Sequence, residues 1–85
     1  MDDIKQTMLE ILNEWDVENL NNHMPKVKFE ERVKSEIGEE NTKLIDSHVR
    51  DLIEEGYVDI LGTIGNLYGG IRLTKEGRDV LRGKI

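Results

Sequence analysis

Three hydrogen-bonding side chains stand at helical spacing in the middle of the chain. Lys43, Ser47 and Arg50 are separated by four and then three residues, so in a helix they share one face. A guanidinium on such a face can bond bidentately to guanine, and an ammonium can meet guanine or a phosphate. Asn41 and Thr42 precede them, where side chains can donate to an anion beside a helix N-terminus. The pattern indicates contact with an anionic partner or, alternatively, a solvated helix face.

His48 lies beside this face and admits two interpretations. It can bond a base edge or a phosphate, or it can be a histidine at the boundary of a partly buried helix. His23 lies in an Asn-rich segment and has no second ligand at metal-binding spacing, and the chain has no cysteine. We therefore expect no metal site and no cofactor.

The carboxylates do not suggest an active site. Several of them are adjacent pairs, such as Glu30-Glu31 and Glu54-Glu55, which is typical of solvated surface. General acid–base catalysis needs carboxylates held in a pocket that shifts their pKa values, and the sequence builds none. No glycine-rich segment matches a nucleotide-binding spacing. We expect no catalytic residues and no enzymatic activity.

Length and charge narrow the class of protein. The 85 residues predict one domain, 1–85, with 36% hydrophobic and 35% charged side chains. No apolar run approaches the roughly 18 residues of a membrane span, and no secretion signal is visible, so we expect a cytoplasmic protein. The net charge of −6 opposes nucleic-acid binding by bulk attraction. Residues 43–85 hold seven acidic and seven basic side chains, so this neutral half can still face an anion.

Periodic apolar residues predict the elements that position these side chains. A first helix over 3–15 has one apolar stripe, formed by Ile4, Met8, Ile11, Leu12 and Trp15. Trp15 is expected to pack in the core, with an acceptor or water for its indole N–H. A second helix over 28–37 carries Phe29, Val33 and Ile37 and ends at Gly38.

The third helix is predicted from a cap at Asn41 or Thr42 to about Glu55, with Gly56 ending it. Its expected buried stripe consists of Ile45, Val49, Leu52 and Ile53. Only a few residues separate it from the second helix, which is typical of a helix-turn-helix arrangement.

A β-hairpin is expected next. Residues 57–61 and 71–74 are rich in β-formers, and Gly65-Asn66 between them suits a two-residue turn. This turn places Val58 opposite Leu73 and Ile60 opposite Ile71, on one face. On the other face it places Asp59 opposite Arg72, an opposite-charge cross-strand pair.

A short last helix over 75–82 is predicted, with Thr74 as its N-cap. Val80 and Leu81 are expected to return to the core. Gly77 lies inside this helix, where it costs roughly 1 kcal/mol against Ala, so we expect a close backbone approach there.

Two stretches resemble a known fold. Residues 45–58, with apolar Val49 and Leu52 followed by Gly56-Tyr57-Val58, are similar to the recognition helix of winged-helix regulators of the ArsR, MarR and PadR type. The stretch 73–81, with Leu73-Thr74, Gly77 and a closing Leu81, resembles the segment after the wing in MarR and PadR proteins and in small YjcQ-like proteins.

The resemblance implies an α+β winged helix: a three-helix bundle with a helix-turn-helix, a two-stranded hairpin as wing, and a short C-terminal helix. It implies a transcriptional regulator that binds double-stranded DNA through its third helix, with the 57–74 hairpin beside it. A homodimer is expected because one small module offers few base contacts. Residues expected at the DNA are Asn41, Thr42, Lys43, Ser47, His48 and Arg50, with Lys28 and Arg32 positioning the backbone.

The hairpin favours a second interpretation. No lysine or arginine occurs between Asp51 and Ile71, so the expected wing tip carries no cation. It carries Ile64, Leu67 and Tyr68 instead, and exposed apolar side chains at a tip indicate a protein contact. The alternative is therefore an acidic winged-helix interaction module that does not bind DNA.

Overall fold

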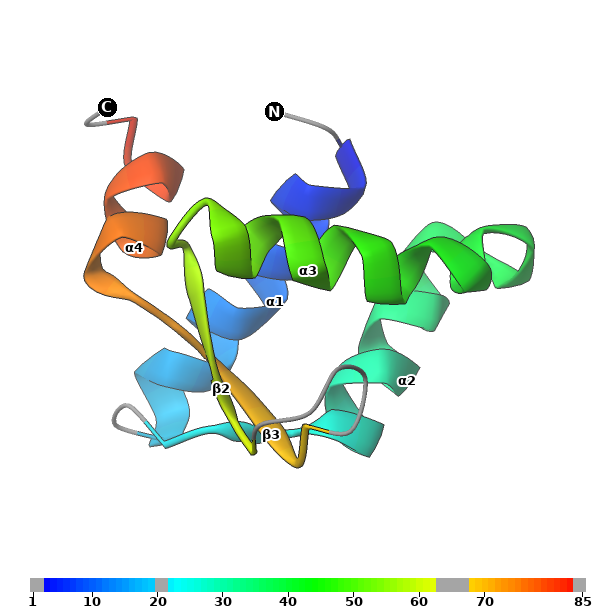
Figure 1. The fold of residues 1–85 in the computed structure, drawn as a ribbon, viewed down its shortest axis with the longest axis horizontal. Helices are drawn as coiled ribbons and strands as arrows, with labels where there is room; N and C mark the ends of the chain where they lie inside the picture. Colours follow the sequence, from blue (N-terminus) through cyan, green and yellow to red (C-terminus); the bar gives the residue numbers. More distant parts are fainter. Residues whose placement is uncertain (1–2, 20–21, 63–67, 84–85) are drawn as a thin grey trace.

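The computed structural model describes residues 3–19, 22–62 and 68–83. It shows an α+β fold in which the other elements pack around the first helix (Figure 1). The described part contains four α-helices, one 3-10 helix and a three-stranded antiparallel sheet of order β1–β3–β2. In chain order the elements are α1 (Asp3–Asn19), β1 (Met24–Pro25), α2 (Lys26–Ile37), η1 (Glu39–Leu44), α3 (Ile45–Glu54), β2 (Val58–Leu61), β3 (Gly70–Leu73) and α4 (Lys75–Leu81). No helix in these ranges is long and apolar enough to cross a membrane.

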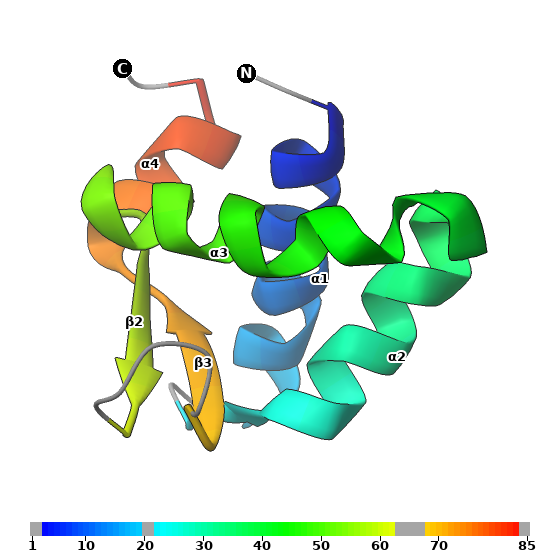
Figure 2. The same cartoon turned by 45° about the vertical axis from the view of Figure 1, so that its right-hand side comes forward.

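Helix α1 organises the core. It packs against α2, α3, α4 and β3, and Figure 2 shows it between α2 on one side and the hairpin with α4 on the other. Its predicted stripe is confirmed at Met8, Ile11 and Leu12, and Leu9 is buried as well. The other buried hydrophobic residues are Met24, Phe29, Val33, Ile45, Val49, Leu52, Val58, Tyr68, Ile71 and Leu73.

Helix α1 runs four residues beyond its predicted end. The side-chain amide of Asn19 donates to the carbonyl of Trp15 at 3.0 Å, and the backbone N–H of Asn22 donates to the carbonyl of Asn19 at 3.1 Å. Asparagine thus closes the last turn here rather than ending the helix earlier. The indole N–H of Trp15 donates to the carbonyl of Asn22 at 2.9 Å, so its expected acceptor is present, although the side chain is only half-buried.

A strand that the sequence analysis missed precedes α2. Met24 and Pro25 pair antiparallel with Ile71 and Gly70 of β3. Pro25 also stands directly before α2 with φ −56°, which suits the entry to a helix. The short β1 therefore ties the start of α2 to the sheet.

The predicted hairpin register is confirmed. Val58 pairs with Leu73, Asp59 with Arg72, and Ile60 with Ile71. The Arg72 guanidinium donates to the Asp59 carboxylate at 3.1 Å on the outer face. Val58, Ile71 and Leu73 are buried, whereas Ile60 is only partly buried. The proposed turn at Gly65-Asn66 lies outside the described residues.

Helix α4 is capped as expected. The backbone N–H of Gly77 donates to the Thr74 hydroxyl oxygen at 3.1 Å, and Val80 and Leu81 pack against the core. A Cβ on Gly77 would collide with the carbonyl oxygen of Tyr57. This contact confirms the close backbone approach predicted for Gly77 and couples α4 to the start of the hairpin.

Candidate functional site

The residues expected at the DNA begin in η1, not in a continuous third helix. Asn41 and Thr42 do not cap α3, which starts at Ile45 after Leu44 with no side-chain cap. The Asn41 amide donates to the carbonyl of Ile37 at 2.8 Å, and the Thr42 hydroxyl donates to the carbonyl of Glu39 at 3.0 Å. These local bonds compete with regular helix and hold residues 39–44 in a tighter turn. The predicted start of the helix, and the capping role of both residues, are therefore wrong.

Lys43, Ser47 and Arg50 are all exposed, as their spacing predicts. The Ser47 hydroxyl donates to the carbonyl of Leu44 at 3.0 Å, so one of its hydrogen bonds is already used within the helix. Neither Lys43 nor Arg50 makes an ion pair with any residue that the structure describes. Both cations are thus available to an external partner.

His48 is half-buried at the edge of this face. Its Nδ1 lies 2.7 Å from the carbonyl oxygen of Leu44, and because a carbonyl only accepts, Nδ1 carries the proton. This bond fixes the ring against the preceding turn. The placement agrees with a boundary histidine and leaves its contact with a base or phosphate as a prediction.

Carboxylates outnumber cations along η1 and α3. Residues 39–55 hold six carboxylates and two basic side chains. Lys5 of α1 partly offsets this excess, with its ammonium 3.4 Å from Asp51 and 3.0 Å from Glu55. The hydrogen bond to Glu55 raises the pKa of Lys5 above its ordinary value. Asp46 and Glu54 then remain on either side of Arg50, at four residues' distance each.

Lys28 and Arg32 are not brought together with this face. The Lys28 ammonium lies over the Trp15 ring, 5.4 Å from its centroid, and the Arg32 guanidinium lies 2.9 Å from the Glu14 carboxylate. Both side chains therefore contact α1. Their expected role in positioning a DNA backbone stays a prediction.

The expected apolar patch at the wing tip is wrong at Tyr68. This residue is 4% exposed, because its ring packs into the core just before β3. The Lys26 ammonium lies 5.1 Å from the centroid of the ring. Ile64 and Leu67, the other two members of the expected patch, lie outside the described residues.

Ile53 is also placed differently from its prediction. Its spacing predicts a place in the buried stripe of the third helix, but it is 36% exposed, whereas the adjacent Leu52 is fully buried. Two neighbouring residues on a helix point about 100° apart, so the burial of Leu52 does not by itself bring Ile53 into the core. Ile53 instead faces the hairpin.

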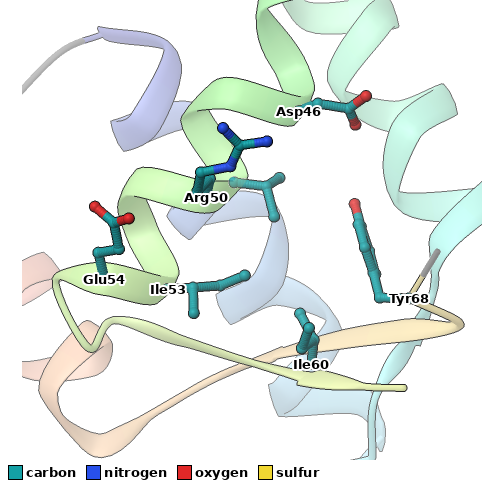
Figure 3. Close-up of a pocket in the computed structure, with 7 residues that line it drawn as sticks. Asp46, Arg50, Ile53, Glu54, Ile60 and Tyr68 are labelled. Carbon is teal, nitrogen blue, oxygen red and sulfur yellow. The ribbon is translucent and has the colours of Figure 1, made fainter. Parts of the chain in front are cut away.

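A pocket of about 260 Å³ lies between α3 and the hairpin. Figure 3 shows α3 forming one wall, with Arg50 between Asp46 and Glu54, and the hairpin side contributing Ile60 and Tyr68. Val49 and Ile53 complete the lining. The sequence does not predict this pocket, although the spacing of Asp46, Arg50 and Glu54 at four residues places them on one helix face.

Comparisons with known proteins return no relative. No family model, no curated protein and no solved structure matches the chain. Within residues 3–19, 22–62 and 68–83, no group of three or more His, Cys, Asp or Glu side chains is arranged to hold a metal ion.

Proposed function

We propose that this chain is a winged-helix protein that binds double-stranded DNA and regulates transcription. In this proposal η1 and α3 enter the major groove, and the β2–β3 hairpin is the wing. The order α2, η1, α3, hairpin and α4, with strand β2 of the hairpin packed against α3, supports a winged-helix arrangement. We propose further that the protein acts in the cytoplasm as a homodimer. Two copies double the few base contacts that one module offers.

The availability of Lys43 and Arg50 carries the proposal. Five other cations are occupied in ion pairs with carboxylates: Lys5, Arg32, Arg72, Lys75 and Arg78. Lys43 and Arg50 instead stand exposed and without an ion pair among the described residues, on the segment that the proposal places in the groove. A phosphate or a guanine edge would give each of them the partner that it lacks.

An acidic interaction module is the second candidate function. The six carboxylates against two cations over residues 39–55 favour it, because such a surface repels phosphate and attracts a basic protein. The exposed Leu61 at the end of β2 offers an apolar contact as well. In this candidate the protein binds no DNA.

The salt dependence of DNA binding separates the two candidates. The full chain is titrated onto a fluorescent duplex of about 30 base pairs, read by anisotropy, at about 50 mM and about 200 mM salt. Two to four neutralised phosphates predict a roughly 10- to 150-fold loss of affinity over this range. If the duplex is not bound even at the lower salt concentration, the DNA-binding proposal fails and the acidic module is favoured.

A further inference from the structure

The Tyr68 hydroxyl in the pocket beside α3 has an unmet hydrogen bond. The side chain is 4% exposed, and its buried oxygen finds no partner among the described residues. Figure 3 shows the hydroxyl pointing from the hairpin along the pocket towards the Asp46 end of α3. Buried polar groups are nearly always hydrogen-bonded, so a hydroxyl that faces a pocket without a protein partner can take its partner from a molecule bound there.

The charge of the rim selects the ligand. Asp46 and Glu54 supply two carboxylates and Arg50 one guanidinium, which leaves a net negative rim. Asp46 is half-buried, so its charge is screened less by water than that of an exposed carboxylate. A cationic group is therefore favoured over an anionic one at the Asp46 end.

The apolar lining of the pocket favours an apolar body for the rest of the ligand. Val49, Ile53 and Ile60 present apolar side chains, and the Tyr68 ring extends this surface. A pocket of about 260 Å³ is smaller than the sites of most drug-sized ligands, which have about 300–1,000 Å³. It suits a compact apolar body of about a dozen heavy atoms or fewer.

We propose that this pocket binds a small organic amine, as a monocation with an apolar body. The ammonium donates to the Asp46 carboxylate and to the Tyr68 hydroxyl oxygen, and the body packs on Val49, Ile53 and Ile60. The hydroxyl stays neutral as an acceptor, because burial, together with the charges of Glu30 and Asp46, raises the pKa of Tyr68 well above its ordinary value.

Occupancy of the pocket would act on DNA binding. A bound cation offsets the Asp46 carboxylate, four residues before Arg50, and so makes the exposed face of α3 less repulsive to phosphate. The amine would then strengthen DNA binding, as a co-repressor does. This regulatory consequence rests on the proposed function, whereas binding of the amine does not.

Three probes of one shape test the ligand class. Phenethylammonium, 2-phenylethanol and 3-phenylpropionate share an aromatic ring and a short linker, and they differ in the charge of the head. Each is titrated into the ¹⁵N-labelled full chain and followed by amide chemical shifts. We expect phenethylammonium to bind with a Kd of about 1 mM, with shifts at residues 46–54, 60 and 68, and 3-phenylpropionate to bind at least about tenfold more weakly.

Two isosteric variants test the named contacts. Asp46→Asn and Tyr68→Phe should each weaken phenethylammonium binding by about tenfold, the usual effect of one lost hydrogen bond to a charged group. Glu36→Gln, an exposed carboxylate on α2, should leave it unchanged. Because the Tyr68 hydroxyl has no partner without ligand, Tyr68→Phe should keep or raise the melting temperature of the free protein.

The results separate this site from the proposed function. Tighter binding of 3-phenylpropionate, no binding of phenethylammonium at 10 times the expected Kd (about 10 mM), or unchanged binding in Tyr68→Phe would each overturn the amine site. Amine binding by a protein that binds no duplex DNA would keep the site and remove only its regulatory consequence. DNA binding without amine binding would keep the proposed function and overturn the amine site.

Discussion

Replacing both Lys43 and Arg50 by alanine is expected to weaken binding to duplex DNA by about 100-fold or more. One base or phosphate contact of this kind is worth about 1–3 kcal/mol, so two lost contacts account for the effect. Both side chains are exposed and make no ion pair within the described ranges, so the fold should be unaffected. Anisotropy titration at low salt measures the affinity, and thermal unfolding checks the fold.

A matched control variant separates the effect of the position of the two cations from the effect of losing two positive charges. Lys34 on α2 and Arg82 after α4 are also exposed and also lack an ion pair in the part of the chain that the structure describes. The variant Lys34→Ala with Arg82→Ala removes the same two charges from other surfaces. This variant should lose less than about tenfold in affinity for DNA, because it loses only the general attraction of two positive charges to the phosphates. Equal losses in the two double variants would contradict the assignment of η1 and α3 to the groove.

Leu52→Ala is expected to lower the free energy of unfolding by about 2–5 kcal/mol, as other truncations of buried leucines do. Leu52 is fully buried on the inner side of α3, in the core cluster that α1 organises. Its loss leaves a cavity at the contact that sets the orientation of α3. Urea unfolding measures the change, with one slope of unfolding free energy against urea concentration fitted to all variants.

The adjacent Ile53 provides the control for this prediction. It is 36% exposed, so Ile53→Ala should cost less than about 1 kcal/mol. The ratio of the two losses in unfolding free energy, at Leu52 and at Ile53, tests the rotation of α3 about its own axis. Similar losses at both positions, or a loss below about 1 kcal/mol at Leu52, would mean that a different face of the helix is buried.

The hairpin was predictable because its information is local and redundant. A strand alternates its faces with a period of two, so one assumed turn fixes every pair at once. The apolar pairs and the pair of Asp59 with Arg72 then agree on the same register. The cap at Thr74 and the close approach at Gly77 were predictable for a similar reason, since each depends on residue types with strong positional preferences.

The elements that the sequence missed depend on contacts distant in the chain. Strand β1 has only two residues and exists through its pairing with β3, more than 40 residues later. The late start of α3 follows from competition between side-chain and backbone hydrogen bonds at Asn41 and Thr42, where spacing alone favoured a cap.

The exposed part of the site was predictable, and the pocket was not. Helical spacing placed Lys43 and Arg50 on the outer face, as observed. The sequence predicts Tyr68 at an exposed tip, whereas its burial depends on packing against elements that are distant in the chain. The pocket exists only where α3 meets residues of the hairpin side, so no segment of the sequence indicates it by itself.

Mapping duplex DNA onto the ¹⁵N-labelled full chain by amide chemical shifts tests the central claim most directly. At low salt, the account predicts that a duplex of about 20 base pairs shifts the amides of Lys43, Ser47 and Arg50 most strongly, with smaller changes along residues 58–61 and 70–73. Shifts confined to α1 and α2, or no shift at any amide at saturating DNA, would contradict it.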